Sequence, residues 1–186
     1  MIDRQDLAKQ IYSASYRTGD FVLRSGQISH DYFDKYQFES NPMLLGLIAK
    51  AMTKLIPGEI EVLAGLELGG IPLVTALSLT TGIPAGYVRK SAKRYGTCSI
   101  VEGGEVRNKN VCVVEDVITT GGQVVKSAEE LRKLGATVRS VVCVIVRQKE
   151  AAVNLHMAGL NLVGLYTMEQ IVAVARGTQS FDLEST

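Results

Sequence analysis

One short stretch of the chain gathers two acidic side chains, two hydroxyls and two glycines. Residues 113–123 read Val-Val-Glu-Asp-Val-Ile-Thr-Thr-Gly-Gly-Gln. The apolar residues before it predict a strand over 111–114 that carries Glu115 and Asp116 to its end, and a helix is predicted from about 123 to 134. A turn between a strand and a helix suits a phosphate monoester, because its unpaired N–H groups and the positive helix terminus favour an anion.

The side chains of this stretch indicate a sugar as well as a phosphate. The glycines let the main chain approach an anion closely, and Thr119 and Thr120 can add hydroxyl donors. Glu115 and Asp116 would repel a bare phosphate, so they fit a ligand with neighbouring hydroxyls or a reaction that develops positive charge. A ribose phosphate substituted at its anomeric carbon meets both conditions. From the chemistry alone, an exposed turn with a helix cap explains the two carboxylates equally well.

Two common phosphate motifs are missing from the sequence. It contains no G-x-x-x-x-G-K-[ST] pattern, which argues against a P-loop nucleotidase. A dinucleotide-binding fold places its G-x-G-x-x-G before the acidic residue, whereas here the acids precede the glycines. This order of acidic residues and glycines therefore argues against an NAD-binding fold.

The rest of the chain alternates helical and extended patterns, which predicts an α/β fold with a mostly parallel sheet. Strands are predicted over 62–66, 85–88, 111–114, 137–146 and 162–166. Helices are predicted around 2–14, over 41–56 with Asn41 as its cap, over 71–81, 123–134 and 149–157, and from 168 onward. Residues 89–110 interrupt this rhythm and indicate a mobile or hairpin-like excursion. Sheets of this kind bind ligands beyond the carboxyl ends of their strands.

Composition bounds the class of protein. The 186 residues fit one domain, with 46% apolar and 21% charged residues. A net charge of +1 gives no global field for nucleic acid or an acidic membrane. The N-terminus lacks the apolar core of a signal peptide, and no apolar run of about 18 residues occurs. Three cysteines without a CxxC pattern and two histidines offer no metal cage, so we expect a reducing cytoplasm.

Residues 113–123 closely resemble the phosphoribosyl diphosphate signature of the type I phosphoribosyltransferases. Further segments resemble the orotate branch of that family in the family's order, and nearly the whole chain is covered. These segments are 21–34 for an N-terminal hood, 65–72 for a pyrophosphate loop, 89–97 for a catalytic flexible loop and 144–150 for a strand end that presents an arginine. The resemblance implies a single phosphoribosyltransferase domain over 1–186, with helix and hood in 1–40, core in 60–166 and flexible loop in 89–110.

The resemblance also implies an activity. The reaction would join orotate and phosphoribosyl diphosphate into orotidine 5′-monophosphate and pyrophosphate, in the synthesis of UMP. Mg²⁺ would be coordinated mainly by the diphosphate rather than by protein ligands. A homodimer would share its flexible loop across the interface, with neither nucleic acid nor membrane as a partner.

The same resemblance assigns roles to individual residues. Lys93 and Asp116 would be catalytic. Binding of phosphoribosyl diphosphate is implied for Arg89, Lys90, Lys93, Tyr95, Glu115, Asp116, Val117, Ile118, Thr119, Thr120, Gly121, Gly122 and Gln123. The pyrophosphate loop would be Glu67, Leu68, Gly69 and Gly70. Orotate would meet Arg24, Tyr32, Phe33, Thr119 and Arg147.

Chemistry supports several of these roles and leaves others open. A guanidinium such as that of Arg147 can bind the orotate carboxylate with two hydrogen bonds. Adenine and hypoxanthine have no carboxylate. Taken alone, the basic residues of 89–97 fit a solvated loop, and Tyr32 and Phe33 fit simple packing. Tyr95 stands where many family members have histidine, and Gly69 where some have lysine. Arg24 replaces a lysine found in some members.

Two other functions remain to be separated from this one. A regulatory sensor of phosphoribosyl diphosphate would bind RNA or DNA through a basic face or an extra module. A phosphoribosyltransferase for uracil or a purine would share the phosphate turn but not the need for Arg147.

Overall fold

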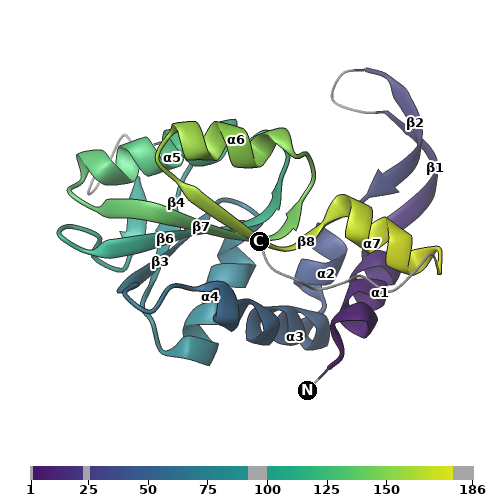
Figure 1. The fold of residues 1–186 in the computed structure, drawn as a ribbon, viewed down its shortest axis with the longest axis horizontal. Helices are drawn as coiled ribbons and strands as arrows, with labels where there is room; N and C mark the ends of the chain where they lie inside the picture. The colour runs from purple at the N-terminus through teal and green to yellow at the C-terminus, as the bar shows by residue number, and fades with distance from the viewer. Residues whose placement is uncertain (1, 23–25, 92–99, 178–186) are drawn as a thin grey trace.

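A six-stranded sheet forms the centre of the protein in the computed structural model, which describes residues 2–22, 26–91 and 100–177 (Figure 1). The strand order is β5-β4-β3-β6-β7-β8. All neighbours are parallel except β5, which runs antiparallel to β4 at one edge. The strands are β3 (Val62–Leu66), β4 (Ala85–Val88), β5 (Val101–Gly103), β6 (Asn110–Ile118), β7 (Thr137–Val146) and β8 (Asn161–Thr167).

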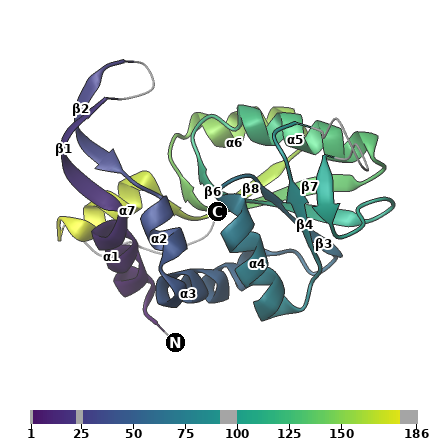
Figure 2. The same cartoon turned by 180° about the vertical axis from the view of Figure 1, so that it is seen from behind.

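Helices cover both faces of the sheet, as Figures 1 and 2 show from opposite sides. One face carries α3 (Pro42–Met52), the short 3-10 turn η1 (Thr53–Leu55) and α4 (Gly70–Thr81); the other carries α5 (Gly122–Lys133) and α6 (Glu150–Met157). Two apolar clusters result, with Val114 in the first and Val113 in the second. Burial on both faces explains why the inner strands read as continuous apolar runs rather than alternating ones.

The N-terminal segment forms a separate hood beside the sheet. It consists of α1 (Arg4–Ser15), the antiparallel pair β1 (Tyr16–Val22) and β2 (Ile28–Phe33), and α2 (Tyr36–Ser40), and α7 (Met168–Ala175) packs beside α1. The β1–β2 pair extends away from the sheet in both views.

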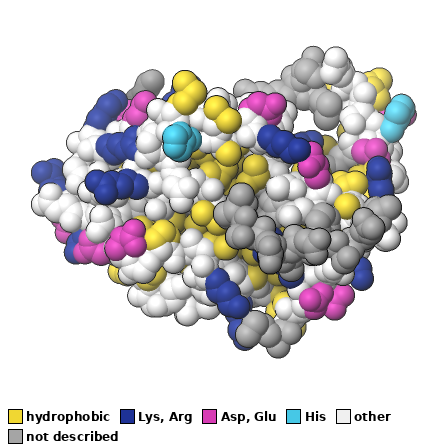
Figure 3. Space-filling view, in the orientation of Figure 1, with side chains coloured by type: hydrophobic (Ala, Val, Ile, Leu, Met, Phe, Trp, Pro, Cys, Tyr) yellow, Lys and Arg dark blue, Asp and Glu magenta, His cyan; other side chains and the backbone are white. Residues whose placement is uncertain are grey.

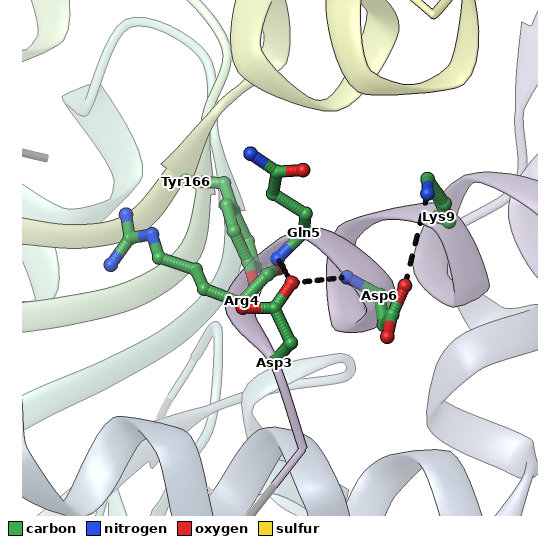
Figure 4. Close-up of polar contacts among 6 residues, drawn as sticks. All are labelled: Asp3, Arg4, Gln5, Asp6, Lys9 and Tyr166. Carbon is green, nitrogen blue, oxygen red and sulfur yellow. Dashed lines mark hydrogen bonds and ion pairs between the residues drawn. The ribbon is translucent and has the colours of Figure 1, made fainter. Parts of the chain in front are cut away.

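The first helix is fixed at its start to the last strand of the sheet (Figure 4). Asp3 caps α1 by accepting hydrogen bonds from the N–H groups of Gln5 and Asp6. The Tyr166 hydroxyl of β8 donates to the Arg4 carbonyl at 2.7 Å, and the Arg4 guanidinium lies 4.9 Å from the centre of the Tyr166 ring. These contacts anchor the hood to the sheet.

The connections define where a ligand can bind. The chain leaves β3 through α4 toward β4, and leaves β6 through α5 toward β7, on the opposite side. Because β3 and β6 are neighbours, their carboxyl ends diverge at a topological switch point. Loops 67–69 and 119–121 therefore lie at the same edge of the sheet.

Most predicted elements are confirmed, and two boundaries are wrong. The strands over 62–66, 85–88 and 137–146 match β3, β4 and β7, and the α/β class is confirmed. The strand predicted over 111–114 continues to Ile118, because Val117 and Ile118 pair with β7. The helix predicted over 41–56 ends as an α-helix at Met52 and continues as η1. Within the described residues, no helix has the length and apolar character needed to cross a membrane.

Candidate active site

The turn between β6 and α5 is open and built from backbone. Thr119, Thr120, Gly122 and Gln123 are exposed. Gly121 precedes the helix with φ +82°, a left-handed conformation that glycine adopts without strain, and it offers no side-chain cap to α5. The N–H groups of the first helical turn are thus left to an external acceptor, and the helix dipole favours one with negative charge.

Neighbouring elements hold this turn in place. Asn154 of α6 donates from Nδ2 to the Thr120 carbonyl at 2.9 Å. The Arg147 N–H donates to the Ile118 carbonyl at 2.8 Å, which ties the end of β6 to the end of β7. Leu155 lies directly beneath Gly121, where an added Cβ would meet its Cγ at 3.0 Å. Asn154 was not among the predicted residues, since no motif links α6 to a turn 34 residues earlier.

The acidic pair lies in a different setting, inside the strand rather than beyond its end. Glu115 is partly exposed, and one of its oxygens accepts a hydrogen bond from the Asp116 N–H at 3.1 Å. Burial and then the charge of Asp116 raise the pKa of Glu115 to about 8. The Asp116 side chain is fully buried, and its Oδ1 accepts a hydrogen bond from the Val117 N–H. The two carboxylates, expected at the end of the strand, therefore lie within it and differ in their exposure.

Three residues from distant segments enclose Asp116. The Lys35 ammonium forms an ion pair with Asp116 Oδ2 at 2.5 Å. The angles of this contact are not those of a hydrogen bond, and Oδ2 has no other hydrogen-bond partner among the described residues. Burial lowers the pKa of Lys35, but the hydrogen bond and charge of Asp116 outweigh it and the net pKa is raised. Glu39 of α2 is 6% exposed, and burial followed by the neighbouring Asp116 carboxylate raises its pKa to about 9.

Gly69 completes this enclosure from the loop after β3. A Cβ built on Gly69 would fall 1.6 Å from Asp116 Oδ2 and 2.9 Å from Glu39 Oε1. Real Cβ contacts are never this short, so the site has no room for any other residue without displacement. Gly69 was among the predicted site residues, but Lys35 and Glu39 were not, because a lysine before a short hood helix and a glutamate within it belong to no motif.

The predicted pyrophosphate loop and the start of the predicted basic loop meet at the ends of β3 and β4. Glu67 Oε1 accepts a hydrogen bond from the Lys90 N–H at 2.6 Å. Leu68 is 63% exposed, and Gly70 is buried where α4 begins. The Arg89 N–H donates to the Ile100 carbonyl, while its buried Nε has no hydrogen-bond partner in the described part of the chain. Lys93 and Tyr95 lie outside the described residues.

The residues predicted to hold the base are only partly brought together. The backbone of Arg147 adjoins the end of β6, and its exposed side chain lines a surface cavity of about 410 Å³ with residues of α7. Tyr32 stacks on Phe21 of the β1–β2 hairpin, with ring centres 5.2 Å apart. Phe33 packs instead on Phe38 in the core, so packing is its observed environment. Arg24 lies outside the described residues.

The fold and the turn together define the class of protein. The phosphoribosyl transferase domain family matches residues 36–161, which include the sheet up to the start of β8 and both loops of the switch point. The site thus has the form expected for a transferase that handles a ribose phosphate.

Relatives narrow this class. An orotate phosphoribosyltransferase of Nocardioides is 46% identical over 90% of this chain and 93% of its own length. A crystal structure of the orotate phosphoribosyltransferase of Mycobacterium tuberculosis is similar with a TM-score of 0.84 and 31% identity, over 91% of this chain and 99% of that one. A structure of the same enzyme in complex with 5-phospho-α-D-ribosyl 1-diphosphate has a TM-score of 0.79 and 28% identity, over 92% of this chain and 99% of that one. The chain belongs to the orotate phosphoribosyltransferase family.

Proposed function

We propose that the chain transfers the phosphoribosyl group of 5-phospho-α-D-ribose 1-diphosphate to orotate at the carboxyl edge of β3 and β6, giving orotidine 5′-monophosphate and pyrophosphate in pyrimidine biosynthesis. The observation that carries this proposal is the uncapped turn 119–122, exposed at Thr119, Thr120 and Gly122, which follows the acidic pair after two residues. The N–H groups and hydroxyls of residues 118–123 bind the 5′-phosphate.

The two carboxylates take different parts in this reaction. Glu115 is partly exposed and accepts hydrogen bonds from the ribose hydroxyls. Asp116 lies behind Lys35, so a direct contact with ribose requires the ammonium to move aside. Its negative charge nonetheless favours the cationic, oxocarbenium-like transition state, because a fixed charge in a buried site acts through a low dielectric.

The leaving pyrophosphate needs cations. Arg89 and Lys90 stand at the end of β4 beside Glu67, and the buried Arg89 Nε has no hydrogen-bond partner among the described residues. Lys93 and Tyr95 add to this group from the flexible loop. Within the described residues, no group of three or more His, Cys, Asp or Glu side chains is placed to hold a metal. A Mg²⁺ ion would be coordinated mainly by diphosphate oxygens. When bound, that ion neutralises charge on the diphosphate.

Arg147 selects orotate by pairing with its carboxylate. The Arg147→Ala variant should weaken orotate binding in calorimetry by about 1–3 kcal/mol, the range for a lost charged hydrogen-bond partner. Arg139→Ala is the matched control, because Arg139 is exposed nearer the opposite end of the same strand. Equal orotate affinity in the wild type and in Arg147→Ala would show that Arg147 does not bind the orotate carboxylate.

The enzyme works as a homodimer whose flexible loop completes the neighbouring site. The test mixes equal amounts of the Lys93→Ala and Asp116→Asn variants, each of low activity, under conditions of subunit exchange. Half of the resulting dimers then contain one subunit of each variant. If the loop is shared, each of these dimers has one intact site, and about a quarter of the wild-type activity is restored. A loop that serves its own subunit restores none.

The reducing cytoplasm is the proposed compartment. Cys112 and Cys143 are both buried and free, and burial raises the pKa of the Cys112 thiol to about 12. Such thiols behave as core residues rather than as redox groups.

One assay tests the activity itself. The protein is mixed with 5-phospho-α-D-ribose 1-diphosphate, Mg²⁺ and orotate, and orotate absorbance is followed beside uracil, adenine and hypoxanthine controls. Consumption of orotate alone is expected. Preference for another base would point to a different phosphoribosyltransferase, and absence of turnover to a regulatory sensor. The face shown in Figure 3 carries basic and acidic side chains together, which gives little support to a nucleic-acid-binding sensor.

A further inference from the structure

The buried carboxylate of Asp116 is held by two charged residues from outside the phosphoribosyl diphosphate signature. Lys35 immediately precedes α2 and Glu39 lies within it, so both come from the hood rather than from the sheet. The Lys35 ammonium is 2.5 Å from Asp116 Oδ2, and its side chain is 32% exposed whereas that of Asp116 has no exposure. Lys35 therefore stands between the carboxylate and solvent.

The charges in this cluster do not balance without a proton. Glu39, Glu115 and Asp116 supply three carboxyl groups, and Lys35 is the cation that acts on all three. The Tyr36 ring on α2 lies 5.4 Å from the Lys35 ammonium. Burial and then the charges of Glu115 and Asp116 raise the pKa of the Cys143 thiol on β7. The buried Glu39 Oε1 has no hydrogen-bond partner among the described residues. A proton on Glu39 lowers the excess negative charge of the cluster from two to one, and the carboxyl group can then donate a hydrogen bond to Asp116.

We propose that Lys35 and Glu39 are positioning residues that fix the Asp116 carboxylate behind the ribose site, Lys35 by opposing its charge and Glu39 by donating a hydrogen bond to it. This inference rests on the proposed role of Asp116 in the transfer. Gly69 belongs to the same arrangement, since any side chain at that position would occupy the space of Asp116 Oδ2.

The arrangement has a direct chemical consequence. An unpaired buried carboxylate is costly, so without Lys35 the acidic groups would share protons or move apart. A protonated or displaced Asp116 no longer opposes positive charge in the transition state. Loss of Lys35 should consequently lower turnover more than it weakens substrate binding.

Kinetics of Lys35 variants test this directly. Lys35→Met is expected to lower kcat about 10- to 100-fold while KM for phosphoribosyl diphosphate changes by less than about threefold. Lys35→Arg should recover part of the lost kcat. The double variant Lys35→Met with Glu39→Gln should have a higher kcat than Lys35→Met alone, because one competing carboxyl group is gone. Lys109→Met is the matched control: it removes a surface ion pair with Glu61 at the opposite end of β6. A rise in KM with unchanged kcat would make Lys35 a substrate ligand and overturn the proposal.

A second readout needs no substrate. The side-chain carboxyl signal of Asp116, assigned in ¹³C-aspartate-labelled protein by its loss in Asp116→Asn, should titrate differently in Lys35→Met and in the wild type. An identical titration in both overturns the positioning role. A wild type that does not consume orotate while this signal responds to Lys35→Met would instead overturn the proposed function alone.

The Glu39 variants keep the proposal testable if Lys35→Met does not fold. Glu39→Gln retains an N–H donor for Asp116 and should keep a higher kcat than Glu39→Ala, which has none. Equal activity in these two variants would overturn the part assigned to Glu39.

Discussion

The phosphate turn and the acidic pair are neighbours in sequence but are built in opposite ways. Turn 119–122 is exposed except at Gly121 and is shaped by its own backbone, with a hydrogen bond from Asn154 to the Thr120 carbonyl. Asp116 is buried, and its surroundings come from Lys35, Glu39 and Gly69. Anion binding at a helix terminus is a local property, whereas the charge state of a buried carboxylate depends on the whole fold around it.

This difference predicts that the two regions fail separately when mutated. Damage to the turn should reduce affinity for the 5′-phosphate and leave the chemistry intact. Damage to the acid cluster should reduce turnover and alter stability with pH, with little loss of phosphate binding.

The largest effect is expected from Asp116→Asn, which removes the buried charge and keeps the shape. Turnover should fall about 100- to 1000-fold, the cost of losing one fixed group that stabilises transition-state charge. Binding of ribose 5-phosphate in calorimetry should stay within about threefold of the wild type, because the turn is untouched. A parallel collapse of phosphate binding would show that the two regions are not separable.

Gly69→Ala should cause the next largest effect, on stability. The new Cβ would fall 1.6 Å from Asp116 Oδ2, so either the loop or the carboxylate must move. We expect a loss of about 1–3 kcal/mol in urea unfolding, as for overpacked buried sites. Gly122→Ala is the control, because its Cβ meets nothing within 4 Å, and it should stay within about 0.5 kcal/mol. Equal losses in both variants would contradict the close approach at Gly69.

Glu39→Gln should change the pH dependence of stability. In the folded wild type burial raises the pKa of Glu39 to about 9, far above the ordinary pKa of a glutamate, 4.5. A raised pKa contributes stability that is present below pH 4.5 and is lost as the pH rises toward 9. Relative to the wild type, the glutamine variant should therefore gain stability steadily between pH 5 and pH 9, by up to about 1.4 kcal/mol per pH unit. Urea unfolding at several pH values measures this, and a difference independent of pH would count against a protonated Glu39.

The smallest effect is expected from Asn154→Ala, which removes the outside support of the turn. The lost hydrogen bond to the Thr120 carbonyl is worth about 0.5–1 kcal/mol, so affinity for ribose 5-phosphate should fall two- to fivefold, by about that energy. Turnover at saturating substrate should not change. Asn161→Ala, at the start of β8, is the control, and a larger loss of turnover than of affinity would contradict the division between the regions.

The fold and the phosphate turn were predictable because their signals are local. Apolar runs bounded by turn residues gave β3, β4 and β7 their correct limits, and glycines after an acidic pair predicted the open turn before α5. The end of β6 was misplaced because acidic residues are unfavourable in strands, and only pairing with β7 carries the strand to Ile118.

The surroundings of Asp116 could not be predicted in the same way. Lys35 and Glu39 are ordinary polar residues of a short hood helix, and nothing in their spacing points to a strand about 80 residues later. Gly69 was singled out as a departure from the family, but its reason is visible only where Asp116 fills the space of the missing side chain. Long-range packing, rather than local pattern, sets this part of the site.

A crystal structure of the protein with 5-phospho-α-D-ribose 1-diphosphate and Mg²⁺ tests the central claim most directly. We predict the 5′-phosphate on the N–H groups of residues 118–123, the ribose hydroxyls at Glu115, and the Lys35 ammonium still paired with Asp116. A sugar phosphate bound elsewhere, with the turn after β6 empty, would contradict the account.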